Sequence, residues 1–125
     1  MSYEDEWVWW LDDACYRVAR GVSLLATPSE VSRDGWDAIE KARADLEQTH
    51  GVCIFRGPFL TDDLGEAAEV NVARYPWVRD LYETTTTMGE AGHALLGLLY
   101  GYSAEAIETF LAARRDEAEV HDASR

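Results

Sequence analysis

The sequence predicts an all-α protein, a single compact bundle of about five to six helices with a short extended connector near residues 52–56. Three observations predict this class. Apolar residues recur every three or four positions over most of the 125 residues, which is the period of an amphipathic helix. Serine, threonine and proline stand where helices would begin, and glycine stands where they would end. The hydrophobic content of 47%, with five Trp, is sufficient for an ordinary core.

The first predicted helix has Ser2 as its N-cap and continues to Leu25. Its inner positions follow three- and four-residue spacing: Trp7, Leu11, Ala14, Val18, Val22 and Leu25. We expect the second helix to begin between residues 28 and 33. The segment Thr27-Pro28-Ser29-Glu30 has the pattern of a capping box with proline at the first helical position, and Ser32 is a competing cap. His50-Gly51 is a typical helix end.

A short apolar segment, residues 52–55, is β-branched and aromatic, but Gly57-Pro58 follows it at once. We therefore expect a buried extended connector. Thr61, followed by two aspartates, predicts a third helix that runs to about Arg74. Pro76 is expected to begin a short fourth helix.

The most buried helix is predicted between Met88 and Tyr100, where the sequence is apolar nearly all round, and Gly101 closes it. Ser103 then caps the last helix. We expect residues 1–115 to form one helical domain and residues 116–125 to form a frayed acidic tail.

Charge is the feature that says most about function. Eleven Lys and Arg against 24 Asp and Glu give a net charge of −13, and no segment is a basic arm. Such a surface repels phosphate and anionic lipid, and it attracts the basic surfaces with which proteins hold nucleic acid. We therefore expect a protein partner with a basic surface, no direct binding of nucleic acid and no membrane contact. The alternative is that the charge serves solubility alone.

The cysteines and the N-terminus predict a cytoplasmic protein. Cys15 and Cys53 form no CxxC pair and therefore indicate reduced thiols. The longest apolar stretch, residues 94–102, is too short to span a bilayer. Glu4, Asp5 and Glu6 stand where a secretory signal would be basic.

A candidate partner-binding patch lies on the first predicted helix. At 100° per residue, two aromatic residues one heptad apart and the neighbouring acids fall on the side opposite the inner positions. Exposed aromatic anchors with an acidic rim suit a basic partner. The candidate residues are Glu6, Trp9, Asp12, Asp13 and Tyr16. The alternative is that a neighbouring helix or a second copy of the chain covers this side.

Residues 97–111 resemble a helix-turn-helix motif. A small residue, Gly97, precedes the turn Gly101 by four positions, Ser103 caps the second helix, and Ile107 would anchor it. The resemblance covers about twenty residues and implies a DNA-binding regulator. Glu105 and Glu108, however, face outward where a DNA reader carries Arg, Lys, Asn or Gln. A purely structural helix hairpin would show the same features.

Catalytic, metal and cofactor sites are not predicted. Glu90 and His93 form one Glu-x-x-His turn, whereas a di-iron bundle needs two such turns and two further Glu. His50, Cys53 and Cys15 lack the spacing of a structural zinc site. P-loop, GxGxxG and GxSxG motifs are absent from the sequence. We therefore expect a protein that is not an enzyme and has no cofactor.

Taken together, these features favour a non-catalytic acidic protein that docks on a basic, nucleic-acid-handling surface of a partner and blocks or modulates it, as a nucleic-acid mimic would. In size and charge, the chain is similar in type to small acidic inhibitors of phages and mobile elements, including anti-CRISPR proteins, without matching residues. One alternative is a helix-turn-helix-like transcriptional regulator. Another is a structural or assembly subunit that associates with itself, as a homodimer through Trp9 and Tyr16.

Overall fold

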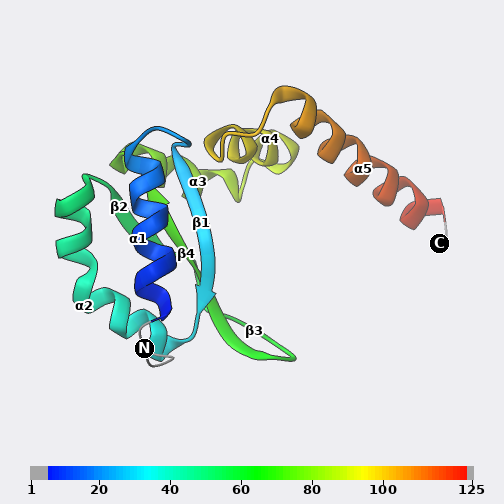
Figure 1. The fold of residues 1–125 in the computed structure, drawn as a ribbon. Helices are drawn as coiled ribbons and strands as arrows, with labels where there is room; N and C mark the ends of the chain where they lie inside the picture. The colour runs from blue at the N-terminus through cyan, green and yellow to red at the C-terminus, as the bar shows by residue number, and fades with distance from the viewer. Residues whose placement is uncertain (1–5, 124–125) are drawn as a thin grey trace. The chain divides into compact units, whose positions relative to one another are not determined.

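Helices and strands alternate in the first part of the chain, and helices follow one another in the last part. A computed structural model describes residues 6–123, with side chains described for residues 7–117. The elements of this part are α1 (Glu6–Ala19), β1 (Leu25–Val31), α2 (Arg33–His50), β2 (Cys53–Arg56), β3 (Leu60–Asp62), β4 (Gly65–Ala73), α3 (Pro76–Thr85), α4 (Gly89–Leu99) and α5 (Ala104–Ala123) (Figure 1). They form two compact units, which divide within α3 between Arg79 and Asp80.

The prediction of an all-α bundle is wrong. The described residues form five helices and a four-stranded antiparallel sheet, so the protein is mixed α/β. Three segments account for the error. Residues 25–31 were expected at the end of one helix and the start of the next, and residues 61–74 as a helix. Residues 52–56 were expected as an extended connector, with their pairing as a strand left open. In the structure these segments contribute β1, β2, and the β3–β4 hairpin.

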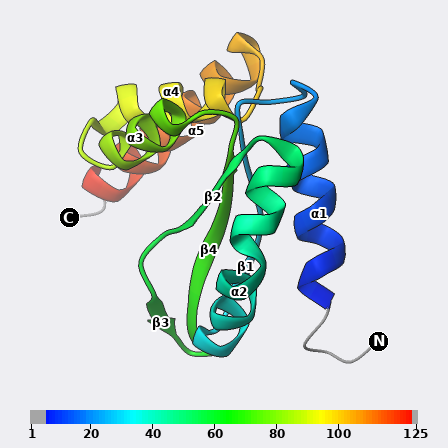
Figure 2. The same cartoon turned by 90° about the vertical axis from the view of Figure 1, so that its left-hand side faces the viewer.

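β4 is the central strand of the sheet. The strand order is β1-β4-β2, and β3 pairs with the first part of β4 as a hairpin (Figure 2). Asp62 pairs with Gly65 across the hairpin turn, and the Asp62 Oδ1 atom accepts a hydrogen bond of 2.8 Å from the Leu64 backbone N–H. Aspartate caps backbone N–H groups in turns as readily as at helix starts. The acidic segment after Thr61 therefore begins a hairpin and not a helix.

β1 contains a proline, which explains why it was mistaken for a helix start. The register of β1 against β4 shifts between Ala26 and Ser29, and Pro28 lies within that irregular stretch. Proline cannot donate to a strand ladder, so it is tolerated in edge strands and at bulges. β1 is an edge strand in this sheet. The second helix begins at Arg33, within the predicted range of 28–33, and of the two candidate caps it uses Ser32.

The local helix boundaries at other positions are confirmed. Gly51 ends α2 with φ of 69°, in the left-handed region. Pro76 is the first residue of α3, and α5 begins directly after Ser103. α5 continues to Ala123 and so includes part of the predicted tail, while the division into a 1–115 domain and a tail stays a prediction.

The core of the first unit lies between one face of the sheet and the two helices α1 and α2, which cover that face (Figure 2). Along β4, Val70 and Val72 point into this core, as the two-residue period of a strand requires. The other members of the cluster are Leu11, Ala14, Cys15 and Val18 from α1, Trp36 and Ile39 from α2, and Val52 and Ile54 at β2. One side of α1 is thereby fixed against the sheet, which leaves its opposite side facing outward.

Candidate functional site

The outward side of α1 exposes two large aromatic side chains. Trp9 is 75% exposed and Tyr16 is 49% exposed, whereas Leu11 on the opposite side of the same helix is fully buried. Seven residues correspond to about two turns, so the two rings lie on the same side. Asp12 and Asp13 between them are also exposed. We call these four residues, Trp9, Asp12, Asp13 and Tyr16, the α1 outer face.

Two of the candidate residues have partners that bear on their availability to a ligand. The Asp12 Oδ1 atom lies 2.8 Å from His50 Nε2, so this carboxylate also links α1 to the end of α2. Arg20 Nη1 donates a hydrogen bond to the Tyr16 hydroxyl, and its guanidinium carbon lies 4.9 Å from the ring centroid. Asp13 makes no hydrogen bond or ion pair with another described residue. The fifth candidate, Glu6, is the first residue of α1, and its side chain lies outside the described part of the chain.

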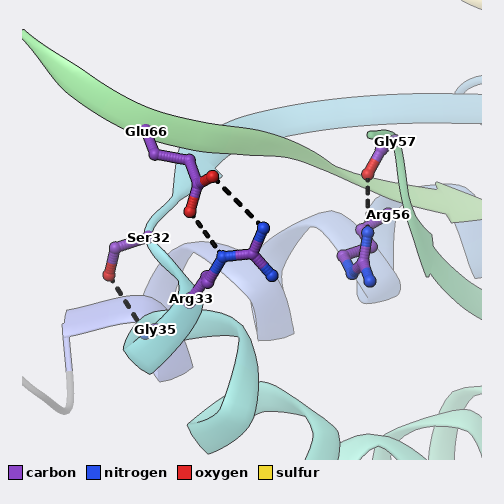
Figure 3. Close-up of polar contacts among 6 residues, drawn as sticks. All are labelled: Ser32, Arg33, Gly35, Arg56, Gly57 and Glu66. Carbon is purple, nitrogen blue, oxygen red and sulfur yellow. Dashed lines mark hydrogen bonds and ion pairs between the residues drawn. The ribbon is translucent and has the colours of Figure 1, made fainter. Parts of the chain in front are cut away.

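The structure also brings together arginines that the sequence analysis did not connect. Arg33, in the first turn of α2, reaches Glu66 on β4: its Nε donates to Oε1 at 2.5 Å and its Nη2 donates to Oε2 at 3.2 Å (Figure 3). The guanidinium carbons of Arg33 and Arg56 lie 4.3 and 4.5 Å from the ring centroid of Phe59. Hydrogen bonding and charge attraction from Glu66 raise the pKa of Arg33 above its ordinary value. This cluster ties the start of α2 to the sheet.

Several cations of the protein are engaged internally in the same way. Arg43 lies 2.9 Å from Glu40 and 3.9 Å from Glu47 along α2. Arg115 on α5 forms ion pairs with Glu90 and Glu108. Since acidic residues outnumber basic ones by more than two to one, these pairs leave a large surplus of carboxylates at the surface. The surface available to a partner is therefore acidic.

The predicted helix-turn-helix residues form a closely packed α4–α5 hairpin. A Cβ built on Gly97 would lie 2.8 Å from Ile107 Cγ1, so only glycine allows this approach. At the turn, Gly101 has φ of 86°, the Gly101 N–H bonds to the Leu98 carbonyl, and the Tyr102 N–H bonds to the Gly97 carbonyl. This pair of hydrogen bonds is a Schellman motif.

The second helix of that hairpin carries acids on its exposed side. Ser103 Oγ accepts a hydrogen bond of 3.1 Å from the Ala106 N–H and so caps α5, as predicted. Glu105 and Glu108 are both exposed, and Glu108 lies 3.2 Å from Arg115. Carboxylates at these positions repel phosphates, and the Arg, Asn and Gln side chains that most often read base edges are missing from them. DNA binding by this hairpin stays a prediction, with the local geometry in its favour and the side chains against it.

The two thiols are poor nucleophiles in their surroundings. Burial, with a smaller contribution from the Asp12 and Glu47 charges, raises the pKa of Cys15 from 9.0 to about 12. Burial also raises the pKa of Cys53. Because the thiolate is the reactive form, neither group is activated at neutral pH. Among the residues that the structure describes, no group of three or more His, Cys, Asp and Glu side chains is placed to hold a metal ion.

No protein-family model, curated protein or solved structure matches this chain. Within residues 6–123, no helix combines the length and the apolar character that crossing a bilayer requires.

Proposed function

We propose that this protein is a non-catalytic, acidic binding protein that docks through the α1 outer face on a basic, nucleic-acid-handling surface of a partner protein and blocks it. The observation that carries the proposal is the exposure of Trp9 and Tyr16 beside carboxylates, on a helix whose other side is buried. Large aromatic residues supply most of the binding energy where they are desolvated at the centre of an interface. Trp9 and Tyr16 are suited to that role.

Charge supports the choice of partner. Residues 1–79 carry a net charge of −7 and residues 80–125 carry −6, so the acidity is not confined to one segment. A surface of this sign is complementary to a surface that binds phosphates, and it accelerates association with it. The attraction acts between exposed charges, so binding should weaken as salt is added.

The two cysteines bear on whether the protein is catalytic and on where it is located. A non-catalytic role is consistent with thiols whose pKa values are raised. We propose a cytoplasmic location, because both Cys15 and Cys53 are free cysteines, as is usual in a reducing compartment.

The experiment is a pull-down with the tagged full chain from a nuclease-treated lysate of the source cell, eluted in steps of increasing salt. We compare the wild type with Trp9→Ala and, as a matched control, Trp77→Ala, which removes another half-exposed Trp that lies on α3. We expect the wild type and Trp77→Ala to capture the same nucleic-acid-binding protein. Trp9→Ala should lose it, and added DNA or RNA should displace it.

Two results of the pull-down would contradict the proposal, and light scattering could give a third. One is capture that Trp9→Ala leaves unchanged, because the α1 outer face would then not be the interface. The other is capture that resists added salt and added nucleic acid, because the partner would then not be held through its phosphate-binding surface. If light scattering shows that the face only joins two copies of the chain, the protein is a self-associating subunit and the docking proposal fails.

A further inference from the structure

A groove opens in the first unit where the N-terminal ends of α1 and α2 lie near the C-terminal end of β1. Its volume is about 780 Å³, within the range of ligand-binding clefts. We call it the tryptophan groove and define it by Trp7 and Trp10 from α1, Glu30 from β1, and Asp34, Asp37 and Lys41 from α2. None of these residues was predicted from the sequence to bind a ligand: Trp7 was assigned to the inner side of the first helix and Glu30 to a capping box.

The lining combines indole rings with an excess of negative charge. Three carboxylates against one ammonium give the groove a net charge of −2. The carboxylates of Glu30, Asp34 and Asp37 are exposed, and none makes a hydrogen bond or ion pair with another described residue. They are therefore open to a ligand. A concave, negatively charged site repels phosphates and attracts cations.

The α1 wall of the groove packs against the core through Trp7 and Trp10, and the α2 wall is fixed by contacts at the start of that helix. Ser32 Oγ accepts a hydrogen bond of 3.2 Å from the Gly35 N–H and fixes the first turn of α2 (Figure 3). Arg33 anchors the same turn to β4 through Glu66. A Cβ on Gly35 would lie 3.1 Å from the Val31 Cβ, so glycine allows α2 to start close against the end of β1. The groove is thus preformed, which lowers the entropic cost of filling it.

We propose that the tryptophan groove receives an arginine side chain from a basic segment of the partner protein. This inference rests on the proposed function, because it names the chemistry by which a basic surface is recognised. A guanidinium group stacks on indole faces and donates hydrogen bonds to carboxylates in a fork, so indole and carboxylate together select it. The lysine ammonium group is the other side-chain cation that could enter the groove. It is a compact point charge and stacks less well on an indole ring.

The test uses the full chain labelled with nitrogen-15 and a blocked tetra-arginine peptide, with blocked tetra-lysine for comparison. Trp7 and Trp10 line the groove, so their indole N–H resonances report on its wall. We expect tetra-arginine to shift the indole resonances of Trp7 and Trp10 and to leave that of Trp77 in place. Tetra-lysine should bind several-fold more weakly.

Matched charge variants separate the groove from the general acidity of the surface. The groove variant is Asp34→Asn with Asp37→Asn, and the control is Asp45→Asn with Asp63→Asn, which removes two exposed carboxylates elsewhere in the same unit. We expect the groove variant to raise the Kd for tetra-arginine about tenfold, which corresponds to about 1.4 kcal/mol. The control should raise it less than about twofold, since distant exposed charges are screened.

Equal weakening in the two double variants would overturn the inference, because the peptide would then be held by diffuse negative charge. Equal binding of the two peptides would overturn the assignment of arginine. Neither result affects the pull-down, in which Trp9→Ala is the decisive variant. Conversely, if the pull-down contradicts the docking proposal, binding of tetra-arginine to the groove can still be measured. Failure of the docking proposal and failure of the arginine proposal are therefore distinguishable.

Discussion

Two substitutions on opposite sides of α1 test whether its outer face contributes to the stability of the fold. Trp9→Ala removes a ring that is 75% exposed, and Leu11→Ala removes a side chain that is fully buried two residues later. Both changes lie on the same helix and both introduce the best helix former. The difference between them therefore measures burial.

The structure gives the magnitude of each effect. About a quarter of the Trp9 surface is covered, which is roughly 60 Å² of an aromatic residue's usual 150–250 Å² and stabilises by about 1.5 kcal/mol at 25 cal/mol per Å². The higher helix propensity of alanine offsets about 0.5 kcal/mol, leaving a loss of about 1 kcal/mol. Leu11→Ala opens a cavity in the core and should cost about 3 kcal/mol.

The assay is urea unfolding followed by far-UV circular dichroism, which does not depend on tryptophan emission. The free energy of unfolding is taken to fall by about 1.5 kcal/mol per M of urea. The urea concentration at the midpoint of unfolding should then be lower by about 2 M for Leu11→Ala and by about 0.7 M for Trp9→Ala. A loss with Trp9→Ala as large as that with Leu11→Ala would refute the reasoning. Trp9 would then be part of the core, and lost capture by that variant would report unfolding.

Two further predictions concern close packing and the buried thiol. A Cβ on Gly92 would lie 2.1 Å from the Thr85 carbonyl oxygen, so Gly92→Ala must displace α4. We expect this substitution to lower the free energy of unfolding by about 2 kcal/mol. The control is Leu98→Ala, at an exposed position of the same helix, which should lower it by less than about 1 kcal/mol. Thermal unfolding compares the two, and equal shifts in Tm would contradict the close approach. The pKa of the Cys15 thiol is 9.0 in the unfolded chain and about 12 in the folded protein. The stability of the wild type relative to Cys15→Ala should therefore fall as the pH rises from 9.0 towards 12. A difference that does not change with pH would contradict this burial effect.

Helix boundaries were predictable from the sequence where the determining contacts are local. Ser32, Ser103 and Gly101 satisfy backbone groups within a few residues of themselves, so their types alone indicate where α2 and α5 begin and α4 ends. The exposure of Trp9 and Tyr16 was predictable for the same reason, since one helical period separates inner from outer positions.

The strands were not predictable by the same reasoning, because their determinants lie far apart in the chain. β4 begins with residues of helical composition, and it is a strand because β1 and β2 pair with its two sides. Its one local indication is the two-residue alternation of Val70, Asn71 and Val72, which a helical reading of residues 61–74 overlooked. The tryptophan groove could not be predicted either, since three elements from different parts of the chain form it.

The placement of the carboxylates in the tryptophan groove supports the proposed binding role over solubility alone. Charge that serves solubility need only be spread over the surface, as are the exposed carboxylates of Glu40 and Asp45 on α2. Asp34 and Asp37 lie instead in a concave groove with two indole rings, and neither carboxylate forms a hydrogen bond or ion pair with another described residue. In the proposed complex, a bound guanidinium supplies these carboxylates with a hydrogen-bonding partner. An arginine ligand should therefore raise the Tm of the wild type by mass action and have less effect on the groove variant.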